Sequence, residues 1–592
     1  MRVALTRRSI ISSCCSSSIV HGPLASSALF RKTTLVYTRS TKLRAMAEGA
    51  STSGGVDLTP LETRIFETLL GACEHHGAST TLRVAGGWVR DKVLGLQSGD
   101  IDIALDDSMG AAFAARVNEY LTNVRGEAAQ SVGVIMANPE QSKHLETATM
   151  KVHGQWIDFV NLRTESYADS SSRIPEIGEG FGTPEQDAYR RDLTINALFY
   201  NINTGCVEDY TGQGLSDLRA GIVRTPLPPK ETFLDDPLRV LRAVRFAARL
   251  GFELDDALAA AMEREDVLKA LEHKVSRERI GTEVEGMIRG PNVARAIRLL
   301  ERHGVLSVVV GIDAMNDVTS PVAAASSSPA SASYSRSMSS TGAAAVEELQ
   351  ELLSALPPSF SASDISTDTK KAAYLAALLL GVRQFSYAGP KKKRCPLAQG
   401  VILEKMKLSK KDAEAVVTVH ESLPEMFALL RRITSVASRF VATEADDPSS
   451  PSLSEGDTRR EAGLLIRKLK GNWISALLTA PLMAQANASD GQQQGADGNE
   501  PTPSAGVSIT EWAAACAEFR VAIEAAGLAE AWSIKPLLSG KEVMSSLGMS
   551  SGGPMLGVAM NRLMEWQLEN PCASKEDCNQ WLNTSLKSEL KL

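Results

Sequence analysis

The sequence predicts an α+β fold, with a β-sheet in the N-terminal part and a long helical region after it. Short apolar or alternating runs at 82–85, 101–105 and 156–160 predict strands. From residue 236 onward, apolar side chains recur at the spacing of an α-helix, which predicts that nearly all of this region is helical. Two of these apolar stripes consist of Leu238, Leu241, Val244 and Ala248, and of Val293, Ile297 and Leu300.

The composition is that of a chain with several hydrophobic cores. Its 592 residues are enough for about three or four domains. The formal net charge of −7 gives no overall basic field, so contacts with nucleic acid must come from local basic patches. Eight scattered cysteines without a C-x-x-C pair argue against a zinc ribbon or a disulfide framework. No apolar run reaches the roughly 18 residues that suggest a membrane span, and we expect no membrane partner.

The N-terminal segment has the composition of an organellar transit peptide. Its first 47 residues contain no Asp or Glu and eight Lys or Arg, with many Ser. We therefore expect residues 1–57 to be a transit peptide and disordered leader that addresses the protein to the mitochondrion or a plastid. A disordered tail without a targeting role is the alternative. Initiation at Met46 would give a second form without this address, in the cytoplasm or nucleus.

A glycine turn follows the first predicted strand. Gly86 and Gly87 come after the run at 82–85 and before a helix predicted to begin at Trp88. Backbone N–H groups exposed at such a turn bind phosphate, and Arg90 is within reach of the same phosphates. A tight turn without a ligand explains the two glycines equally well.

Paired carboxylates mark the second predicted strand. Asp100 and Asp102 are two residues apart, so their side chains project to the same side. Their mutual repulsion calls for a cation, and hard oxygen ligands at this spacing suit Mg²⁺. Two Mg²⁺ ions in such a site activate an attacking hydroxyl group and stabilise a leaving pyrophosphate. On its own, the D-x-D pattern fits a solvated strand better.

Asp158, on the third predicted strand, is a candidate third carboxylate. It is placed to accept the proton of the attacking hydroxyl group. A strand-face aspartate paired with Arg163 is the alternative.

The helix predicted after residue 235 begins with a pattern that can select a base. Asp236 suits the N-cap position and Pro237 the first helical position. Arg239, Arg242 and Arg245 follow at steps of three residues, on one slowly drifting face. An Asp236–Arg239 pair matches cytosine and adenine, which present an exocyclic amine beside an unprotonated ring nitrogen, whereas uracil and guanine leave it unpaired. Taken alone, the pattern also describes an N-capped amphipathic helix with a charged outer face.

Three low-complexity segments interrupt the helical region. They are rich in Ala and Ser at 312–345, in acidic residues, Ser and Pro at 442–460, and in Gln, Gly and Asp at 485–506. Such compositions bury too little apolar surface to fold alone. We therefore expect loops inserted into a helical scaffold.

The motifs of this chain resemble those of the class II tRNA nucleotidyltransferases, most closely the eukaryotic type of CCA-adding enzyme, in the nucleotidyltransferase and poly(A) polymerase superfamily. The resemblance is strongest from about residue 61 to residue 310, and similar segments of lower specificity follow at 410–414 and 535–554. The family's nucleotide-selecting motif commonly begins Glu-Asp, whereas here Asp235 takes the first place, which leaves the role of Asp235 open. Five family motifs occur in order, at 86–102, 190–197, 209–218, 235–245 and 276–280.

The resemblance implies a domain order and a reaction. The domains are a mixed-sheet nucleotidyltransferase head at 58–225, an all-α nucleotide-selecting neck at 226–310, an all-α body at 311–440 and an all-α, tRNA-binding tail at 441–592. The reaction is addition of C, C and A to tRNA lacking all or part of CCA, from CTP and ATP, with two Mg²⁺ ions and no template. The resemblance implies that Asp100 and Asp102 hold the metal for catalysis, and that the nucleotide is bound by Gly87, Arg90, Arg191, Asp236, Arg239, Arg242 and Arg245. To these we add Asp158 for catalysis and Gly86 and Asp192 for the nucleotide.

Two further segments carry expectations about switching and RNA contact. In the loop at 170–184, Arg173 and Glu176 are expected to pair transiently and to switch the pocket from C to A. The best local basic patch is a candidate RNA contact with salt-dependent binding, although a nuclear localisation signal or a solvated loop explains it as well. It comprises Lys391, Lys392, Lys393 and Arg394.

Two other functions stay open at the level of the sequence. A poly(A) polymerase of the same superfamily would use ATP alone. A non-catalytic RNA-binding scaffold on the same fold would incorporate no nucleotide, and the intact Asp100 and Asp102 argue against it.

Overall fold

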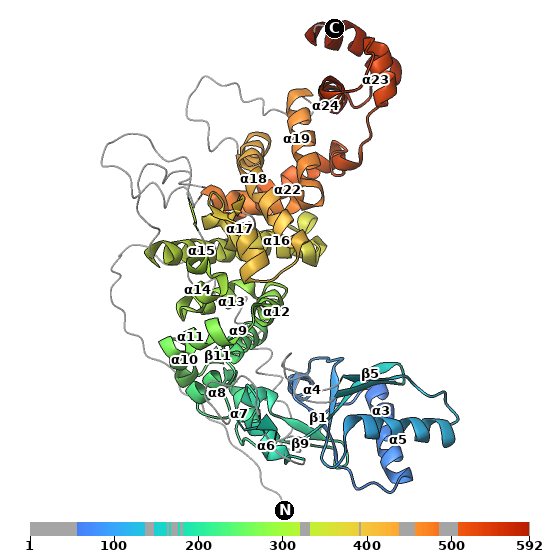
Figure 1. Cartoon of the computed structure of the whole chain (residues 1–592), viewed down its shortest axis with the longest axis vertical. Helices are drawn as coiled ribbons and strands as arrows, with labels where there is room; N and C mark the ends of the chain where they lie inside the picture. The colour runs from blue at the N-terminus through green and yellow to red at the C-terminus, as the bar shows by residue number, and fades with distance from the viewer. Residues whose placement is uncertain are drawn as a thin grey trace, which may run out of the picture.

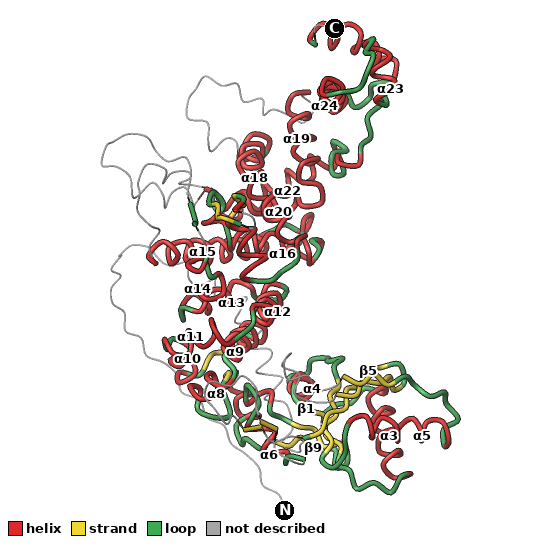
Figure 2. Tube along the Cα trace, in the orientation of Figure 1, coloured by secondary structure: helices red, strands yellow, loops and turns green. Residues whose placement is uncertain are grey.

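The computed structural model describes residues 56–135, 147–162, 165–166, 176–177, 181–315, 317–319, 332–389, 392–436, 456–484 and 507–590. Figure 1 shows an elongated molecule, with a sheet and its helices at one end and a succession of helices that continues to the C-terminal end. Figure 2 shows the same division, since the strands gather at one end and the remainder is almost entirely helical. The predicted order, a sheet first and helices after it, is confirmed.

A seven-stranded mixed sheet forms the N-terminal end, in the order β3-β4-β5-β2-β1-β8-β9. Strands β2 and β5 are parallel, and the other neighbours are antiparallel. A parallel pair needs a crossover, and here the chain passes through a helix and two strands before it returns as β5. The strands are β1 (Leu82–Ala85), β2 (Ile101–Leu105), β3 (Val132–Ile135), β4 (Thr147–Val152), β5 (Gln155–Asn161), β8 (Phe199–Asn201) and β9 (Cys206–Glu208).

Helices α3 (Pro60–His75) and α5 (Gly110–Asn123) lie on one side of this sheet (Figure 1). A capping box between Thr59 and Glu62 starts α3, because each side chain accepts a hydrogen bond from the backbone of the other. α5 packs on β4 and β5, where the rings of Phe113 and Phe159 meet edge to face at 5.2 Å. Since side chains alternate along a strand, the neighbours of Phe159 project to the opposite face of the sheet.

A group of helices follows the sheet and contains the arginine-rich helix α9 (Leu238–Leu250). Its buried side, which includes Val240, Val244 and Ala247, packs against α12 and α13. Gly251 ends α9 in the left-handed conformation, with φ of 73°, which glycine adopts without strain. The other elements here are α4 (Gly87–Val93), β6 (Glu165–Ser166), β7 (Glu176–Ile177), α6 (Pro184–Tyr189), α7 (Gly214–Ala220), β10 (Ile222–Val223), α8 (Pro229–Asp235), β11 (Glu253–Leu254), α10 (Asp256–Met262), α11 (Glu265–Lys274), α12 (Arg277–Ile288), α13 (Val293–Arg302) and α14 (Val305–Val310).

The next helices extend the same hydrophobic core. Leu349, Leu375 and Val416 are among its buried residues. Within the described ranges, no helix combines the length and the hydropathy needed to cross a membrane. The elements are α15 (Ala332–Ala355), α16 (Thr367–Leu378), β12 (Ser386–Ala388), β13 (Arg394–Pro396), α17 (Leu397–Gly400), α18 (Lys410–Ile433), α19 (Gly456–Leu469), α20 (Trp473–Thr479) and α22 (Ile509–Ala525).

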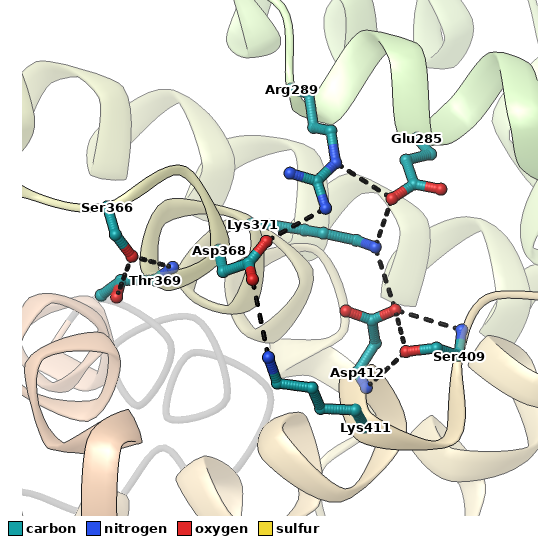
Figure 3. Close-up of polar contacts among 9 residues, drawn as sticks. All are labelled: Glu285, Arg289, Ser366, Asp368, Thr369, Lys371, Ser409, Lys411 and Asp412. Atoms are coloured by element: carbon teal, nitrogen blue, oxygen red, sulfur yellow. Dashed lines mark hydrogen bonds and ion pairs between the residues drawn. The ribbon is translucent and has the colours of Figure 1, made fainter.

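A polar network ties three of these helices together (Figure 3). Lys371 of α16 is 5% exposed, and its ammonium group lies 2.6 Å from Glu285 of α12 and 2.9 Å from Asp412 of α18. Arg289 donates to Glu285 from the same helix, and Ser409 caps α18 through Asp412. A buried lysine is tolerated here because two carboxylates compensate its charge.

The predicted loop at 312–345 is wrong in its second half, because α15 begins at Ala332. Small side chains let α15 and α16 approach closely, as a Cβ atom at Gly342 would lie 2.0 Å from the carbonyl oxygen of Leu378. The predicted loop at 442–460 also ends early, since α19 begins at Gly456. Residues 1–55 and the segment 485–506 lie outside the described residues.

The last helices enclose a small core of their own. Leu538, Val543, Leu563 and Leu582 belong to it, whereas α19, α20 and α22 contribute to the main core. Residues 441–592, predicted as one tail, therefore take part in two cores. The helices of the second core are α23 (Gly540–Leu547), α24 (Pro554–Glu569), α25 (Lys575–Trp581) and α26 (Lys587–Glu589).

Candidate active site

The side of the sheet opposite α5 meets α9 at a large polar cavity of about 780 Å³. Strands β1, β2 and β5, the glycine turn after β1, the segment at 187–196 and α9 all contribute to its wall. The cavity brings together most of the residues that the sequence predicts for nucleotide and metal binding. These are Gly86, Gly87, Arg90, Asp100, Asp102, Asp158, Arg191, Asp192, Asp236, Arg239 and Arg242.

Three carboxylates meet on the sheet side of the cavity. Asp102 and Asp158 are direct neighbours in the register of β2 and β5, and Asp100 lines the cavity beside them. The hydroxyl group of Thr149 on β4 donates a hydrogen bond of 2.7 Å to Asp158 Oδ1. Asp102 faces the open cavity, yet the protein atoms crowded around it restrict water and raise its pKa. The charges of Asp158 and Asp100 also raise the pKa of Asp102, while Arg191 lowers it.

This carboxylate cluster fits a divalent cation. Restricted access of water contributes most to the raised pKa of Asp102, and the charges of Asp158 and Asp100 add to it despite the opposing charge of Arg191. Among the described residues, no three His, Cys, Asp or Glu side chains enclose a metal by themselves. Mg²⁺ needs only one or two carboxylates when phosphate oxygens and water complete its shell. Asp100 and Asp102 are the residues of this cavity suited to hold it.

The glycine turn lets an arginine approach the cavity wall closely. Gly86 has φ of 73°, and a Cβ atom there would lie 2.9 Å from Arg191 Nη1. Arg191 donates through Nε and Nη2 to one oxygen of the buried Asp187, at 3.0 and 2.8 Å, and its guanidinium lies over the ring of Phe199. Burial raises the pKa of Asp187, but Arg191 and Arg190 outweigh this and leave the pKa lowered. The charged carboxylate therefore fixes Arg191 in place.

Asn196 links two more of the predicted residues, although no role of its own was predicted for it from the sequence. Its side-chain oxygen accepts a hydrogen bond of 2.6 Å from the buried Arg90, and its amide group donates to Asp192. Arg242 of α9 donates to the other oxygen of Asp192 at 2.6 Å. Burial raises the pKa of Asp192, but Arg242 and Asn196 outweigh it and hold the pKa below its usual range. Asp192 thus positions Arg242.

Asp236 and Arg239 line the cavity but each is held by a different partner. Asp236 accepts a hydrogen bond of 3.2 Å from the backbone N–H of Leu238, as expected of an N-cap residue. The regular helix begins at Leu238, one residue later than predicted. Its other oxygen accepts from Arg279 of α12 at 2.8 Å. Arg239 donates to the carbonyl oxygen of Arg190 at 2.7 Å. Both side chains are oriented before a nucleotide binds.

The structure separates Arg245 from the other arginines of α9. Arg245 donates to Glu283 of α12 at 2.5 Å and does not line the cavity. Phe246 and Arg249 line it instead. Residues seven apart lie closer to the same face of a helix than residues three apart. The spacing of Arg249 from Arg242 was therefore the sequence signal that would have placed Arg249 at the cavity.

The remaining predicted segments are described only in part. Arg173 and Lys391 lie outside the described residues, and Glu176 falls in β7, which pairs with β6. Lys392 and Lys393 lie in the turn between β12 and β13, and Arg394 forms an ion pair of 2.8 Å with Asp317. The switch and RNA-contact roles of these residues stay predictions.

Comparison with known proteins places the sheet region in a class. The family model of the poly A polymerase head domain matches residues 82–224, which hold β1, β2, β5 and the three carboxylates. The crystal structure of the Bacillus stearothermophilus CCA-adding enzyme in complex with CTP has a TM-score of 0.54 with this chain. That match covers 90% of this chain and all of the other at 20% identity, which shows a shared fold.

Two relatives resemble the chain over most of its length. The mitochondrial CCA tRNA nucleotidyltransferase of Saccharomyces cerevisiae is 34% identical over 535 residues, which cover 86% of this chain and 88% of the relative. The tRNA nucleotidyltransferase cca2 of Schizosaccharomyces pombe is 32% identical, over 86% of this chain and 93% of the relative. The chain belongs to the CCA tRNA nucleotidyltransferase family.

Proposed function

We propose that this chain adds C, C and A to the 3′ end of tRNA that lacks all or part of CCA, from CTP and ATP and without a nucleic-acid template. The observation that carries the proposal is one cavity in which Asp100, Asp102 and Asp158 lie together with Asp236 and Arg239. The carboxylates suit phosphoryl transfer, and the Asp–Arg pair suits the choice of base. The two fungal tRNA nucleotidyltransferases that match most of the chain support the same activity.

Base selection follows from the two fixed side chains. Asp236 accepts a hydrogen bond from the exocyclic amine of cytosine or adenine, and Arg239 donates one to the adjacent ring nitrogen. Arg279 and the carbonyl oxygen of Arg190 hold this pair in position. Uracil or guanine would leave polar groups buried without partners, at about 1–3 kcal/mol for each group.

The transfer step uses the carboxylates on the sheet. Asp158, oriented by Thr149, accepts the proton of the RNA 3′-hydroxyl group as that oxygen attacks the α-phosphate and pyrophosphate leaves. Mg²⁺ held by Asp100 and Asp102 would supply positive charge to the phosphates.

Three arginines of the cavity wall act on the triphosphate. Arg90, Arg191 and Arg242 are each anchored by a carboxylate or amide of the protein, so they bring fixed positive charge to the phosphates without reorganising. Asp192 contributes by holding Arg242 rather than by contacting the nucleotide.

We propose the division of the chain into a head at 58–225, a neck at 226–310, a body at 311–440 and a tail at 441–592, with residues 1–57 directing import into the mitochondrion. The sheet lies in the first of these segments, and α9 and α12 lie in the second. The mitochondrial name of the Saccharomyces cerevisiae relative supports the address. N-terminal sequencing of the cellular forms tests both the address and the shorter form from Met46.

The test is incorporation into tRNA that lacks CCA, with each labelled triphosphate alone and with CTP and ATP together. We expect addition of C, C and A in that order, and no incorporation from UTP or GTP. An Asp102→Asn variant should lose at least about 100-fold in rate, because several kcal/mol of charge stabilisation disappear with the ligand. Its affinity for CTP in the absence of Mg²⁺ serves as the folding control.

Other outcomes would identify the rival functions. A long A tail from ATP alone would identify a poly(A) polymerase. RNA binding without incorporation of any nucleotide would identify a non-catalytic scaffold.

A further inference from the structure

An exposed tryptophan lies on the same face of the sheet as the carboxylates. Trp156 of β5 is 51% exposed, and it precedes Asp158 by two residues, so both side chains project to the cavity side. Ile157 and Phe159 between and beyond them are fully buried on the other face. A single exposed apolar side chain is ordinary, so its position rather than its exposure sets Trp156 apart.

A cation accompanies this ring. Lys151 of β4 is the direct cross-strand partner of Trp156, and its ammonium group lies 4.9 Å from the ring centroid. The next pair on the same face is Thr149 with Asp158, which are hydrogen-bonded to each other. The two strands therefore present an aromatic ring with a cation one step away from the carboxylate proposed to accept the proton.

The order of the strands separates the part of the cavity that holds the triphosphate from the part that the attacking hydroxyl group approaches. Arg90, Arg191 and Arg242 come from the segments around β1 and from α9, whereas β5 and β4 lie on the other side of β2. In phosphoryl transfer the attacking and leaving oxygens are roughly in line, so the hydroxyl group approaches from the side opposite the pyrophosphate. With the triphosphate held by the arginines, the RNA end arrives over β5 and β4.

We propose that Trp156 and Lys151 form a binding site for the single-stranded 3′ end of the RNA, in which Trp156 stacks on a terminal base and Lys151 neutralises the adjacent phosphate. The inference rests on the proposed function, because it concerns the RNA that accepts the nucleotides. Stacking on an aromatic ring is tolerant of sequence, since every base has a π face. That tolerance suits an end whose last base changes with each addition.

The test compares two RNA minihelices that lack CCA, identical except that one has an abasic terminal nucleotide, on the wild type and on Trp156→Ala. For the intact minihelix, Trp156→Ala should raise the KM about 5-fold to 100-fold, while kcat and the KM for CTP change far less. The abasic end should raise the KM of the wild type by a similar factor. It should have little further effect on Trp156→Ala, because the same contact has already been lost.

Three variants complete the design. Trp156→Phe keeps a stacking surface and should restore most of the affinity. Lys151→Met should weaken RNA binding and reduce its salt dependence by about one unit of slope. Val521→Ala removes an apolar side chain that is 53% exposed on α22 and should leave every parameter unchanged.

The outcomes separate this site from the proposed function. If Trp156→Ala keeps the wild-type KM, or if its effect and that of the abasic end multiply, the stacking site is overturned while CCA addition stands. If the wild type itself adds neither C nor A to the intact minihelix or to tRNA, the proposed function falls first.

Discussion

Arg245 and Arg249 of α9 differ in what they touch, although both are arginines of one helix. Arg245 contacts Glu283 of α12 and lies 4.5 Å from the ring centroid of Phe246. Arg249 lines the cavity and donates to Asp91 at 3.2 Å, with 43% of its side chain exposed. One arginine therefore ties α9 to its neighbour, and the other presents charge to the cavity.

Arg249→Ala should raise the KM for CTP and for ATP alike, by about 10-fold to 100-fold. A charge-assisted hydrogen bond is worth about 1.5–3 kcal/mol, and phosphate contacts do not distinguish the bases. Steady-state kinetics with each nucleotide measures the effect. A change confined to one nucleotide would contradict a phosphate contact and indicate a contact with the base.

Arg245→Ala is the matched control on the same helix. It should lower the free energy of unfolding by about 1–3 kcal/mol, because Glu283 is buried and loses its nearest cation. The KM for CTP should change less than about threefold. Thermal unfolding and kinetics on one preparation give both values.

At the scale of single residues, the sequence predicted the side chains that line the cavity better than the side chains that hold them in place. Asp100, Asp102 and Asp236 are recognisable because short motifs keep such side chains together in the chain. The links from Asn196 to Arg90 and from Arg279 to Asp236 join distant segments, and a single sequence contains no signal for such contacts. Asp187 and Arg191 are only four residues apart, so their spacing was a signal that could have been read.

Among the elements, α12 links the candidate active site to the helices beyond it. Arg279 holds Asp236, which lies just before α9, and Glu283 accepts from Arg245 of α9. Glu285 on the same helix accepts from Lys371. Lys371 also reaches Asp412, so α12, α16 and α18 share one buried cation (Figure 3). A substitution in this network therefore also affects α12, the helix that holds Asp236 of the base-selecting pair.

Lys371→Met should lower the free energy of unfolding by about 2–4 kcal/mol, because two carboxylates lose a buried partner. The range begins below the usual cost of breaking a buried ion pair, because Glu285 is 36% exposed and solvent screens its interaction with Lys371. Urea unfolding measures the difference. Lys411→Met removes a lysine that is 84% exposed and lies 3.5 Å from Asp368, and it should cost less than about 0.5 kcal/mol.

The difference in the free energy of unfolding between the wild type and Lys371→Met should depend on pH. Lys371 and Arg289 lower the pKa of Glu285 against its partial burial. Burial raises the pKa of Asp412, but Ser409 and Lys371 outweigh it and leave the pKa lowered. Groups with a lowered pKa stabilise the fold above their ordinary values of about 4, and this stabilisation is lost as the pH falls through the folded-state pKa. The difference between wild type and Lys371→Met should therefore shrink from about pH 5 to pH 3; a constant difference would contradict the ion pairs.

For the whole molecule, the contact of α12 with the chain at Met406 sets the spacing between the sheet-proximal helices and those that follow. A Cβ atom at Gly281 would lie 1.9 Å from the carbonyl oxygen of Met406. The oxygen belongs to the backbone and the position of a Cβ atom is fixed by the backbone, so no rotamer change relieves the overlap. The absence of a side chain at Gly281 therefore allows α12 to lie directly against the backbone at Met406.

Gly281→Ala should lower the free energy of unfolding by about 1–3 kcal/mol or more, although alanine has the higher helix propensity. Gly557→Ala on α24 is the control, since no atom lies within 4 Å of the added Cβ. That variant should be neutral or more stable by up to about 1 kcal/mol. Equal effects of the two substitutions would show that helix propensity rather than packing decides the outcome.

The sequence predicted those elements of the architecture that show a regular spacing of apolar residues along the chain. The strands at 82–85, 101–105 and 156–160 and the helical nature of the C-terminal part follow from the spacing of apolar residues. The strand order, the parallel pairing of β2 with β5 and the helical state of 332–345 depend on contacts between distant segments. Composition alone made 332–345 resemble a loop, because small residues serve both loops and closely packed helices.

The pairing of β2 with β5 also determines when the protein becomes competent during its synthesis. Asp102 and Asp158 become neighbours only after α5, β3 and β4 have been made, and Asp236 emerges later still. Contacts of such sequence separation form late, because the intervening chain must first be ordered. We therefore expect a chain that is made from its N-terminus to bind no nucleotide productively until α9 has been made and has docked on the sheet.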